Sequence, residues 1–241
     1  MKLSVLMPTF NEEKFLEQIV NRVLVQKVDG IDSIELIIVD DKSTDRTKEI
    51  IKDLTQKHST SIKAVFHETN MGKGAALQTA IEIMSGDICI VQDADLEYDP
   101  ADYKQMIEPI IYGRADCVYG SRFMTTQSRR VLFFWHSIGN RFLTLLSNMV
   151  TNLNLTDMET CYKAFRVPLL KSIPLRSQRF GIEPELTAKI ARRRFRIYEV
   201  GISYDGRTYD QGKKIGWKDG VQAIYVILKY WFINDSTIKA K

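Results

Sequence analysis

The stretch from Asp87 to Glu97 constrains the fold of this chain most, because an apolar run ends there in three carboxylates. Residues 88–91 carry no charge, and such a run is typical of a parallel strand that is buried on both faces. Asp93, Asp95 and Glu97 follow at alternate positions, so their side chains share one side of the strand end. The pattern predicts an α/β fold, in which ligands bind outside the carboxyl ends of such strands.

The three carboxylates indicate a site for a divalent cation. Carboxylates placed so close together repel one another unless a cation or bound protons compensate their charge. Oxygen ligands that leave positions open for substrate phosphates suit Mg²⁺ or Mn²⁺. We therefore expect Asp93, Asp95 and Glu97 to bind Mg²⁺ or Mn²⁺ as the cofactor. The alternative for such residues is an ordinary role as helix caps or in a solvated turn.

Two further strands are expected to end at the same edge of the sheet. Residues 34–40 lead into Asp41 and Asp45, which also fit as caps of the next helix, and residues 2–7 lead through Pro8 to a candidate helix cap at Asn11. Strand and helix patterns alternate, which predicts a doubly wound, mostly parallel, Rossmann-like sheet with helices on both faces. The expected strands are 2–7, 34–40, 62–66, 87–92 and 116–120, and the expected helices are 12–26, 45–58, 73–84 and 102–112.

Four more sequence blocks follow in order along the chain: Asn70–Ala76, Gly120–Phe123, Asp157–Arg166 and Gly212–Ile215. Together with the three strand ends they resemble the nucleotide-sugar-dependent family 2 glycosyltransferases of the GT-A fold. Within that family they are similar to the polyprenyl-phosphate hexosyltransferase branch, which includes the dolichyl-phosphate mannose synthases. The resemblance covers nearly the whole chain. It implies an inverting transfer of a hexose from a GDP- or UDP-sugar to a dolichyl or undecaprenyl monophosphate.

The resemblance also implies a single glycosyltransferase domain over residues 1–241. A chain of 241 residues with 44% hydrophobic and 27% charged content can bury a sizeable core without splitting. We expect residues 1–100 to bind the nucleotide sugar, residues 101–219 to bind the acceptor, and residues 220–241 to form an amphipathic helix and tail.

Single residues receive roles by the same resemblance. The nucleotide-sugar-binding residues would be Pro8, Phe10, Glu12, Asp40, Lys73 and Asp93, with Asp40 facing the nucleoside. The catalytic residues would be Asp95, Arg122 and Arg207. Negative charge develops on the departing β-phosphate, and a metal ion with basic side chains can neutralise it. The alternative for Lys73, which lies between two glycines, is a solvated lysine in the first turn of a helix.

The expected acceptor needs positive charge rather than a base. A phosphate monoester has a second pKa of about 6, so its attacking oxygen is already anionic at neutral pH, whereas an alcohol needs a proton acceptor. Where the branch has an arginine four residues before the serine that matches Ser137, this chain has Phe133, and Arg129 and Arg130 also fit as ordinary surface cations. The acceptor-phosphate candidates are Arg130, Ser137, Lys213 and Lys214.

Two apolar stretches bear on membrane contact. Residues 131–135 lead into a helix with Ile138, Phe142 and Leu145 on one side, and residues 220–233 form the second stretch. Neither has the ~20 apolar residues that span a bilayer. Both can lie at a lipid interface, helped by the net charge of +4, although a core helix is the alternative for the second. We expect a cytoplasmic protein in peripheral contact with the membrane surface.

Other functional classes have less support in the sequence. Gly72-Lys73-Gly74 lacks the glycine spacing of a P-loop, and the first strand is not followed by a dinucleotide-binding G-x-G-x-x-G turn. The three histidines lack the spacing of a zinc site, and the three cysteines are expected to be reduced core thiols. The start of the chain lacks a secretion signal. Arg192–Arg196 fits the solvated end of a helix rather than a nucleic-acid site. Two alternatives stay open: the same fold with a hydroxyl acceptor, and a non-catalytic nucleotide-sugar-binding scaffold. Oligomeric state and membrane-protein partners are also left open.

Overall fold

The computed structural model describes residues 1–124, 130–131, 133–207 and 217–232. Its strands are β1 (Lys2–Thr9), β2 (Ser33–Asp40), β3 (Ile62–Phe66), β4 (Ile88–Val91), β5 (Cys117–Ser121), β6 (Lys163–Arg166) and β7 (Ile197–Gly201). Its helices are α1 (Leu16–Leu24), α2 (Thr47–Lys57), α3 (Lys73–Ile83), α4 (Tyr103–Ile111), α5 (Phe134–Thr151), α6 (Val167–Lys171), α7 (Ile182–Arg192) and α8 (Trp217–Phe232), with a short 3-10 helix at Pro100–Asp102.

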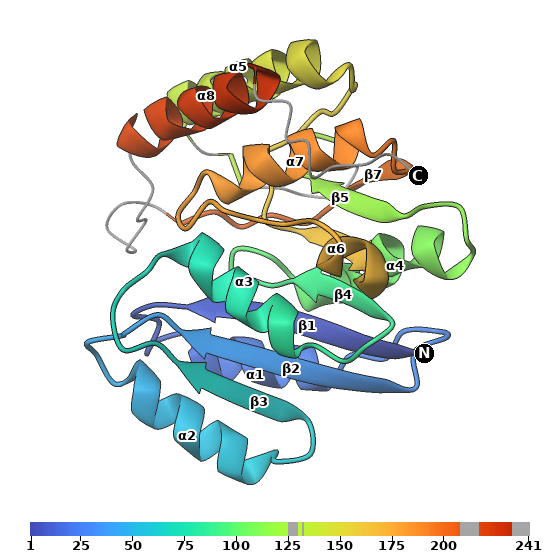
Figure 1. Ribbon diagram of the computed structural model, residues 1–241. Coiled ribbons are helices and arrows are strands. Elements are labelled where there is room, and N and C mark those ends of the chain that lie inside the picture. The colour runs from blue at the N-terminus through green and yellow to red at the C-terminus, as the bar shows by residue number, and fades with distance from the viewer. Residues whose placement is uncertain (125–129, 132, 208–216, 233–241) are drawn as a thin grey trace.

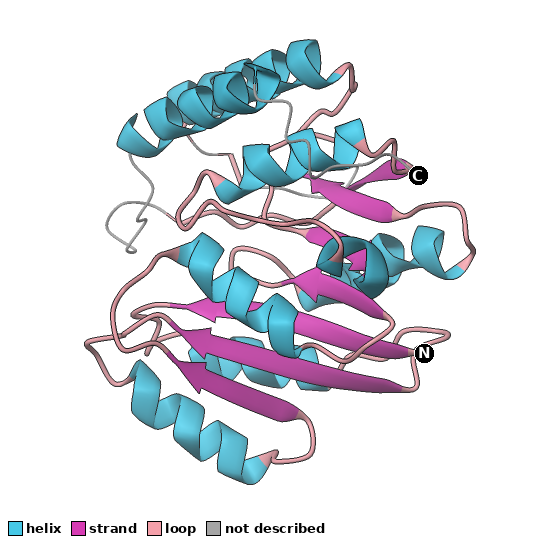
Figure 2. Ribbon diagram, in the orientation of Figure 1, coloured by secondary structure: helices cyan, strands magenta, loops and turns pink. Residues whose placement is uncertain are grey.

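The seven strands form one sheet in the order β3-β2-β1-β4-β6-β5-β7, with helices on both faces (Figure 1, Figure 2). Every neighbouring pair is parallel except those of β6, which runs antiparallel to both β4 and β5. The expected doubly wound, mostly parallel sheet is therefore confirmed. Because β6 is reversed, its first residue lies at the edge where its neighbours end.

Alternation along the strands builds a hydrophobic core on each face of the sheet. On β1, Leu3 and Val5 pack into the cluster that contains α1 and α4, whereas Leu6 packs into the cluster that contains α3. All three side chains are fully buried. Full burial of such a side chain stabilises a fold by roughly 1.5–3 kcal/mol, so the strand register is strongly specified.

The strands and helices expected in the first half are all present; β3 has the expected ends, and the other elements differ from the expected ends by a few residues. The largest difference is at α1, which begins at Leu16 rather than at residue 12. Asn11 does not cap this helix, because its backbone turns through a φ of 51° and its Oδ1 accepts a hydrogen bond from Thr44 N at 2.8 Å. Asp45 lies just before α2, whose N-cap is Arg46, and its Oδ1 accepts a hydrogen bond from Thr47 N, in the first turn, at 3.0 Å.

The second half adds a further helical layer outside the sheet. Helices α5 and α8 contact α7 and each other, and they form the outermost layer in Figure 1. Helix α8 buries Ala223, Val226 and Ile227 against the protein while Trp231 and Phe232 are exposed, so it belongs to the core on one face only. In the described ranges, no helix has both the length and the apolar character to span a bilayer.

Candidate active site

The residues singled out in the sequence gather at the carboxyl ends of β1, β2 and β4. Thr9, the last residue of β1, pairs with Asp40 of β2, so Phe10 and Glu12 emerge beside that carboxylate. Asp40 is buried and accepts hydrogen bonds from Ser43 N at 3.3 Å. The predicted nucleoside-binding residues, Pro8 included, thus share one edge of the sheet with the acidic residues that follow β4.

Arg207 joins three of the carboxylates at this edge. Its guanidinium donates to Asp95 Oδ2 at 2.6 Å, to Glu97 Oε1 at 3.1 Å and to Glu12 Oε2 at 3.2 Å. The ring of Phe15 lies 5.8 Å from the guanidinium carbon. A segment 110 residues further along the chain than Glu97 therefore supplies the cation that holds Asp95, Glu97 and Glu12 together.

Lys73 forms the corresponding ion pair with Asp93. Its Nζ lies 2.6 Å from Asp93 Oδ1 and 2.8 Å from Cys161 Sγ. Burial acts to raise the pKa of Asp93, but Lys73, Cys161 and Arg207 together outweigh it and hold that pKa below its ordinary value. Lys73 is therefore not a solvated lysine. Cys161 is half-buried and packs against the core, whereas Cys89 and Cys117 are buried in strands.

Asp95 is the carboxyl group of this edge whose ionised form is disfavoured by its surroundings. Burial and the charges of Asp93 and Glu97 raise its pKa to about 7, although Arg207 acts in the opposite direction. A carboxyl group in this environment gains from any additional positive charge, because each neighbouring carboxylate disfavours its ionised form. Its oxygen atoms thus suit a hard divalent cation.

No group of three histidine, cysteine or acidic side chains in the described ranges is arranged as a ready metal site. Arg207 and Lys73 instead neutralise the carboxylates that we expected to bind the metal. The donor set fits Mg²⁺ or Mn²⁺ in its chemistry, since all its ligand atoms are carboxylate oxygens and their repulsion is what a divalent cation relieves. The metal assignment of Asp93, Asp95 and Glu97 remains a prediction.

Asp41 and two glycines set the position of Lys73. Asp41 accepts hydrogen bonds from Met71 N at 2.8 Å and Gly72 N at 2.7 Å, rather than capping α2 as one interpretation of the sequence allowed. Gly72 has a φ of +98°, and an added Cβ would lie 2.5 Å from Gln178 O. The glycines therefore serve close packing at the start of α3, and this packing directs Lys73 toward Asp93.

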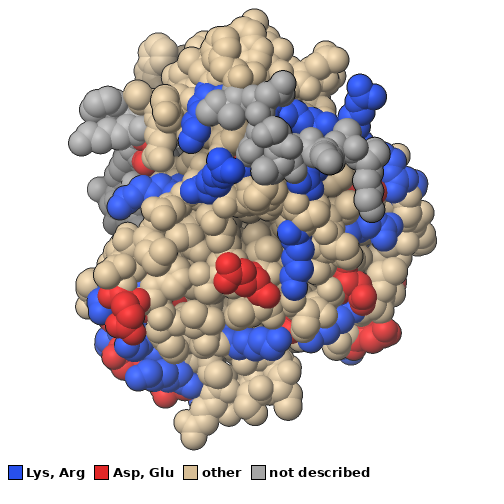
Figure 3. Space-filling model, in the orientation of Figure 1, with Lys and Arg blue, Asp and Glu red and all other residues tan. Residues whose placement is uncertain are grey.

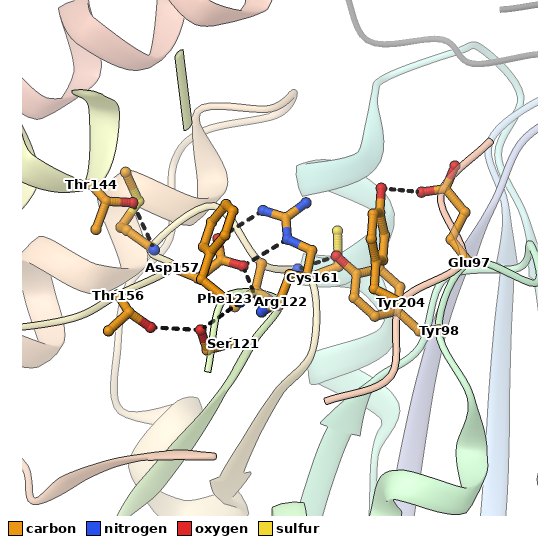
Figure 4. A network of polar contacts seen from close by, with 12 residues as sticks. Glu97, Tyr98, Ser121, Arg122, Phe123, Thr144, Thr156, Asp157, Cys161 and Tyr204 are labelled. Carbon is orange, nitrogen blue, oxygen red and sulfur yellow. Dashed lines mark hydrogen bonds and ion pairs between the residues drawn. The ribbon is translucent and has the colours of Figure 1, made fainter. Parts of the chain in front are cut away.

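Arg122 lies on the other side of the carboxylates, at the end of β5. Figure 4 shows its guanidinium between Asp157 and the ring of Tyr204. It donates two hydrogen bonds of 2.7 Å to Asp157, which is fully buried, and its guanidinium carbon is 5.2 Å from the Tyr204 ring centroid. Tyr204 in turn donates to Glu97 Oε2 at 2.9 Å. Burial opposes the charge of Arg122, but Asp157, Tyr98 and Tyr204 together outweigh it and raise the pKa of Arg122 well above its ordinary value.

The acceptor candidates are less clustered. Arg130 donates to Gly206 O at 3.0 Å and lies 3.8 Å from Asp205, so it contacts the segment that carries Arg207. Ser137 is in the first turn of α5, where its backbone N–H donates to Phe133 O at 3.2 Å. Lys213 and Lys214 lie outside the described residues.

Sequence reasoning missed Asp157 and Tyr204, and it gave Glu12 a different neighbour. Asp157 and Arg122 are 35 residues apart, and no local spacing indicates that they pair. One signal was present: Asp157 and Arg122 both lie in sequence blocks that carried the family resemblance.

The sheet and its acidic edge define an α/β protein of the GT-A fold. The chain belongs to the family described as glycosyl transferase family 2, whose model matches residues 4–173. It is therefore a glycosyltransferase of that family.

Similar proteins include several enzymes named for polyprenyl-phosphate sugar transfer. UDP-N-acetylglucosamine–dolichyl-phosphate N-acetylglucosaminyltransferase of Methanococcus voltae is 27% identical, with 92% of this chain and 93% of that protein covered. Dodecaprenyl-phosphate galacturonate synthase of Rhizobium johnstonii is also 27% identical, over 88% of this chain and 62% of that protein. The chain thus spans nearly all of the first relative and less than two thirds of the second.

Among solved structures, glucosyl-3-phosphoglycerate synthase from Mycobacterium tuberculosis is similar in fold. The TM-score is 0.71 at 24% identity, with 98% of this chain and 81% of that chain covered. This likeness confirms the fold expected from the sequence.

Proposed function

We propose that this protein transfers one hexose from a nucleoside-diphosphate sugar to a polyprenyl monophosphate, with inversion at the anomeric carbon. The observation that carries the proposal is the acidic edge after β4, where Asp95 and Glu97 share Arg207 and Asp93 is paired with Lys73. The names of the relatives from Methanococcus voltae and Rhizobium johnstonii support a polyprenyl-phosphate acceptor.

The donor binds along the carboxyl ends of the strands. Pro8, Phe10 and Glu12 contact the base and ribose, Asp40 faces the nucleoside, and the diphosphate lies over the end of β4. Asp93, Asp95 and Glu97 would hold Mg²⁺ or Mn²⁺, which would supply Lewis-acid neutralisation of the leaving diphosphate. The similar glucosyl-3-phosphoglycerate synthase was crystallised with Mn²⁺ and uridine diphosphate, which supports a divalent cofactor.

Basic side chains of the chain itself meet the charge that develops during transfer. An oxygen of the acceptor phosphate bonds to the anomeric carbon as the bond from that carbon to the β-phosphate oxygen breaks. The nucleoside diphosphate leaves with the bonding electron pair, and no proton has to be removed. Lys73 and Arg207 exchange their carboxylate partners for phosphate oxygens, and Arg122 is held in place by Asp157 for the same purpose.

The acceptor side includes Arg130, Ser137, Lys213 and Lys214, with Phe133 at the position where the branch has an arginine. We place this half of the domain, residues 101–219, against the membrane that holds the lipid, on the cytoplasmic side. Helix α5 supports the placement because it buries the polar Thr144 and Ser147 while exposing apolar residues such as Trp135, 79% exposed, and Met149, 74% exposed.

A donor and acceptor screen tests the proposal. The protein is incubated with radiolabelled UDP- and GDP-sugars and polyprenyl phosphate, with and without EDTA, and label in the organic phase is counted. Metal-dependent transfer to lipid is expected. Transfer only to a hydroxyl compound, tight donor binding without turnover, or full activity after rigorous chelation would each contradict a stated part of the proposal.

A further inference from the structure

Glu159 stands out in a buried charge cluster beside the site. Three ion pairs make up the rest of the cluster: Lys73 with Asp93, Arg122 with Asp157, and Lys163 with Glu183. In the part of the chain that the structure describes, no ion pair involves Glu159, although the charges of Lys163 and Arg122 act on it. The cluster therefore contains one more carboxyl group than it has cations.

Two neighbouring polar atoms here lack partners. Glu159 Oε1 and Thr160 Oγ1 are both buried and have no hydrogen-bond partner within the described ranges. Buried polar atoms in folded proteins are nearly always hydrogen-bonded, so an unsatisfied pair of adjacent residues calls for a cause such as a bound ligand. Glu159 as a residue is half-buried, whereas Thr160 is fully buried.

The sheet topology places these atoms on the opposite side of Asp93 from Asp40, the residue that the proposed function assigns to the nucleoside. Because β6 is antiparallel, the residues just before it lie at the edge where β4 ends. Along this edge Asp40 follows β2, Asp93 follows β4, and Glu159 precedes β6 in the order of the sheet. The side chain two residues further on, Cys161, contacts Lys73, and the Glu183 charge acts on both Lys73 and Glu159.

The chemistry of the pair excludes a phosphate as its ligand. An acidic side chain repels phosphate oxygens, and the excess of carboxyl groups makes this repulsion stronger. A sugar hydroxyl fits both atoms, since it can donate to the carboxyl oxygen of Glu159 and accept from the hydroxyl of Thr160. Burial and the charge of Glu183 raise the pKa of Glu159 to about 7, so both the protonated and the ionised carboxyl group are accessible near neutral pH. An uncharged sugar hydroxyl can form a hydrogen bond with either form.

We infer that Glu159 and Thr160 form the subsite that binds hydroxyl groups of the transferred sugar, and thereby help to select the donor. This inference rests on the proposed function, because it requires a nucleotide sugar at the end of β4. It assigns the sugar to the β6 side of the diphosphate and the nucleoside to the β1–β2 side.

Calorimetric titration separates binding of the sugar from binding of the nucleotide. UDP, GDP, UDP-glucose, UDP-N-acetylglucosamine and GDP-mannose are titrated into wild-type protein, Glu159→Gln and Thr160→Val in the presence of Mn²⁺. The matched control is Glu82→Gln, an exposed position on α3. For the best-bound nucleotide sugar, Glu159→Gln is expected to weaken affinity about tenfold or more, while affinity for the free nucleoside diphosphate changes less than about twofold.

The outcomes distinguish this inference from the proposed function. Equal affinity of wild type and Glu159→Gln for the nucleotide sugar would overturn the subsite while leaving the proposed function intact. Loss of nucleoside diphosphate binding together with a lower melting temperature would also overturn it, since that result indicates a structural role. If wild-type protein binds none of the five compounds, the result contradicts the proposed function and, with it, the sugar subsite.

Discussion

At the scale of single residues, each carboxylate of the acidic edge depends on a cation from a distant segment. Asp93, Asp95 and Glu97 lie within one short segment. Their partners come from other segments: Lys73 is 20 residues from Asp93, and Arg207 is 112 residues from Asp95. A buried charge that loses its partner is strongly destabilising, whereas a site full of like charges is poised to bind a counterion. Changes at these residues should therefore affect stability and turnover in different ways.

Asp95→Asn should reduce turnover about 100-fold or more and leave the fold intact. The change removes a charged ligand from the leaving diphosphate site, where several kcal/mol of charge stabilisation are at stake. Stability should not fall, because burial and two neighbouring carboxylates already raise the pKa of Asp95 to about 7. Transfer assays and thermal unfolding of the variant check both expectations. Asp53→Asn, at an exposed position on α2, is the control, and normal turnover in Asp95→Asn would remove the assigned role.

Glu159→Gln should make the protein more stable above neutral pH. The pKa of Glu159 is raised from 4.5 to about 7, so between these values the folded protein holds a proton that the unfolded chain releases. Wild-type stability therefore falls as pH rises through this window, and glutamine avoids the loss. The gain at pH 8 over pH 4 should reach at most about 3 kcal/mol.

Urea unfolding of wild type and Glu159→Gln at pH 4, 6 and 8 measures this difference. Glu82→Gln should show no comparable trend. A variant that is less stable than wild type at pH 8 would indicate that Glu159 stabilises the fold, which contradicts its interpretation as a group reserved for a ligand.

At the scale of elements, the start of α3 links the second half of the chain to the donor side. Ala75 N donates to Gln178 O at 3.0 Å, and Gln78 Nε2 donates to Ser177 O at 3.0 Å. Glu185 of α7 accepts a hydrogen bond from Arg176 N at 2.9 Å, which fixes the same loop. The position of Lys73 thus depends on packing between α3 and the loop before α7.

Gly74→Ala should destabilise the protein by about 1–3 kcal/mol and weaken donor binding. An added Cβ would overlap the carbonyl oxygen of Ser177 and lie 2.9 Å from the carbonyl carbon of Gln178, so α3 must move and displace Lys73. Denaturant unfolding and donor titration measure the two effects. In contrast, Gly220→Ala in α8 meets no atom within 4 Å and should stabilise the helix by roughly 0.5–1 kcal/mol.

The elements of the first half could be predicted because each carries a local signal. Apolar runs such as residues 88–91 alternate with amphipathic stretches, and Asn, Asp and Gly separate them. β6 was missed, since Lys163–Arg166 has two charged residues in four and finds its place only by pairing with β4 and β5. The partners of Arg122 and Arg207 were missed for the same reason: tertiary packing, rather than spacing, decides which charges meet.

At the scale of the whole molecule, the outer helical layer presents an apolar face. Beyond α7, the surface over α5 and α8 in Figure 3 is mostly uncharged, and lysine and arginine side chains border it. α5 contains no acidic residue, and α8 contains one, Asp219. An apolar face with basic borders is complementary to an anionic lipid surface, whereas a cationic lipid surface would repel the basic side chains.

Replacing Trp231 and Phe232 by serine should reduce association with anionic liposomes several-fold without unfolding the protein. Both side chains are exposed, at 55% and 76%, so serine leaves the core unchanged and removes only apolar area that a bilayer interface would bury. Cosedimentation with phosphatidylglycerol vesicles measures the effect. The matched control is Val25→Ser with Tyr112→Ser, which removes apolar side chains that are 71% and 66% exposed elsewhere on the surface. If both double variants sediment like wild type, the α5–α8 face does not contact lipid, whereas a concentration-dependent change in molecular mass would indicate that a second copy of the chain covers it.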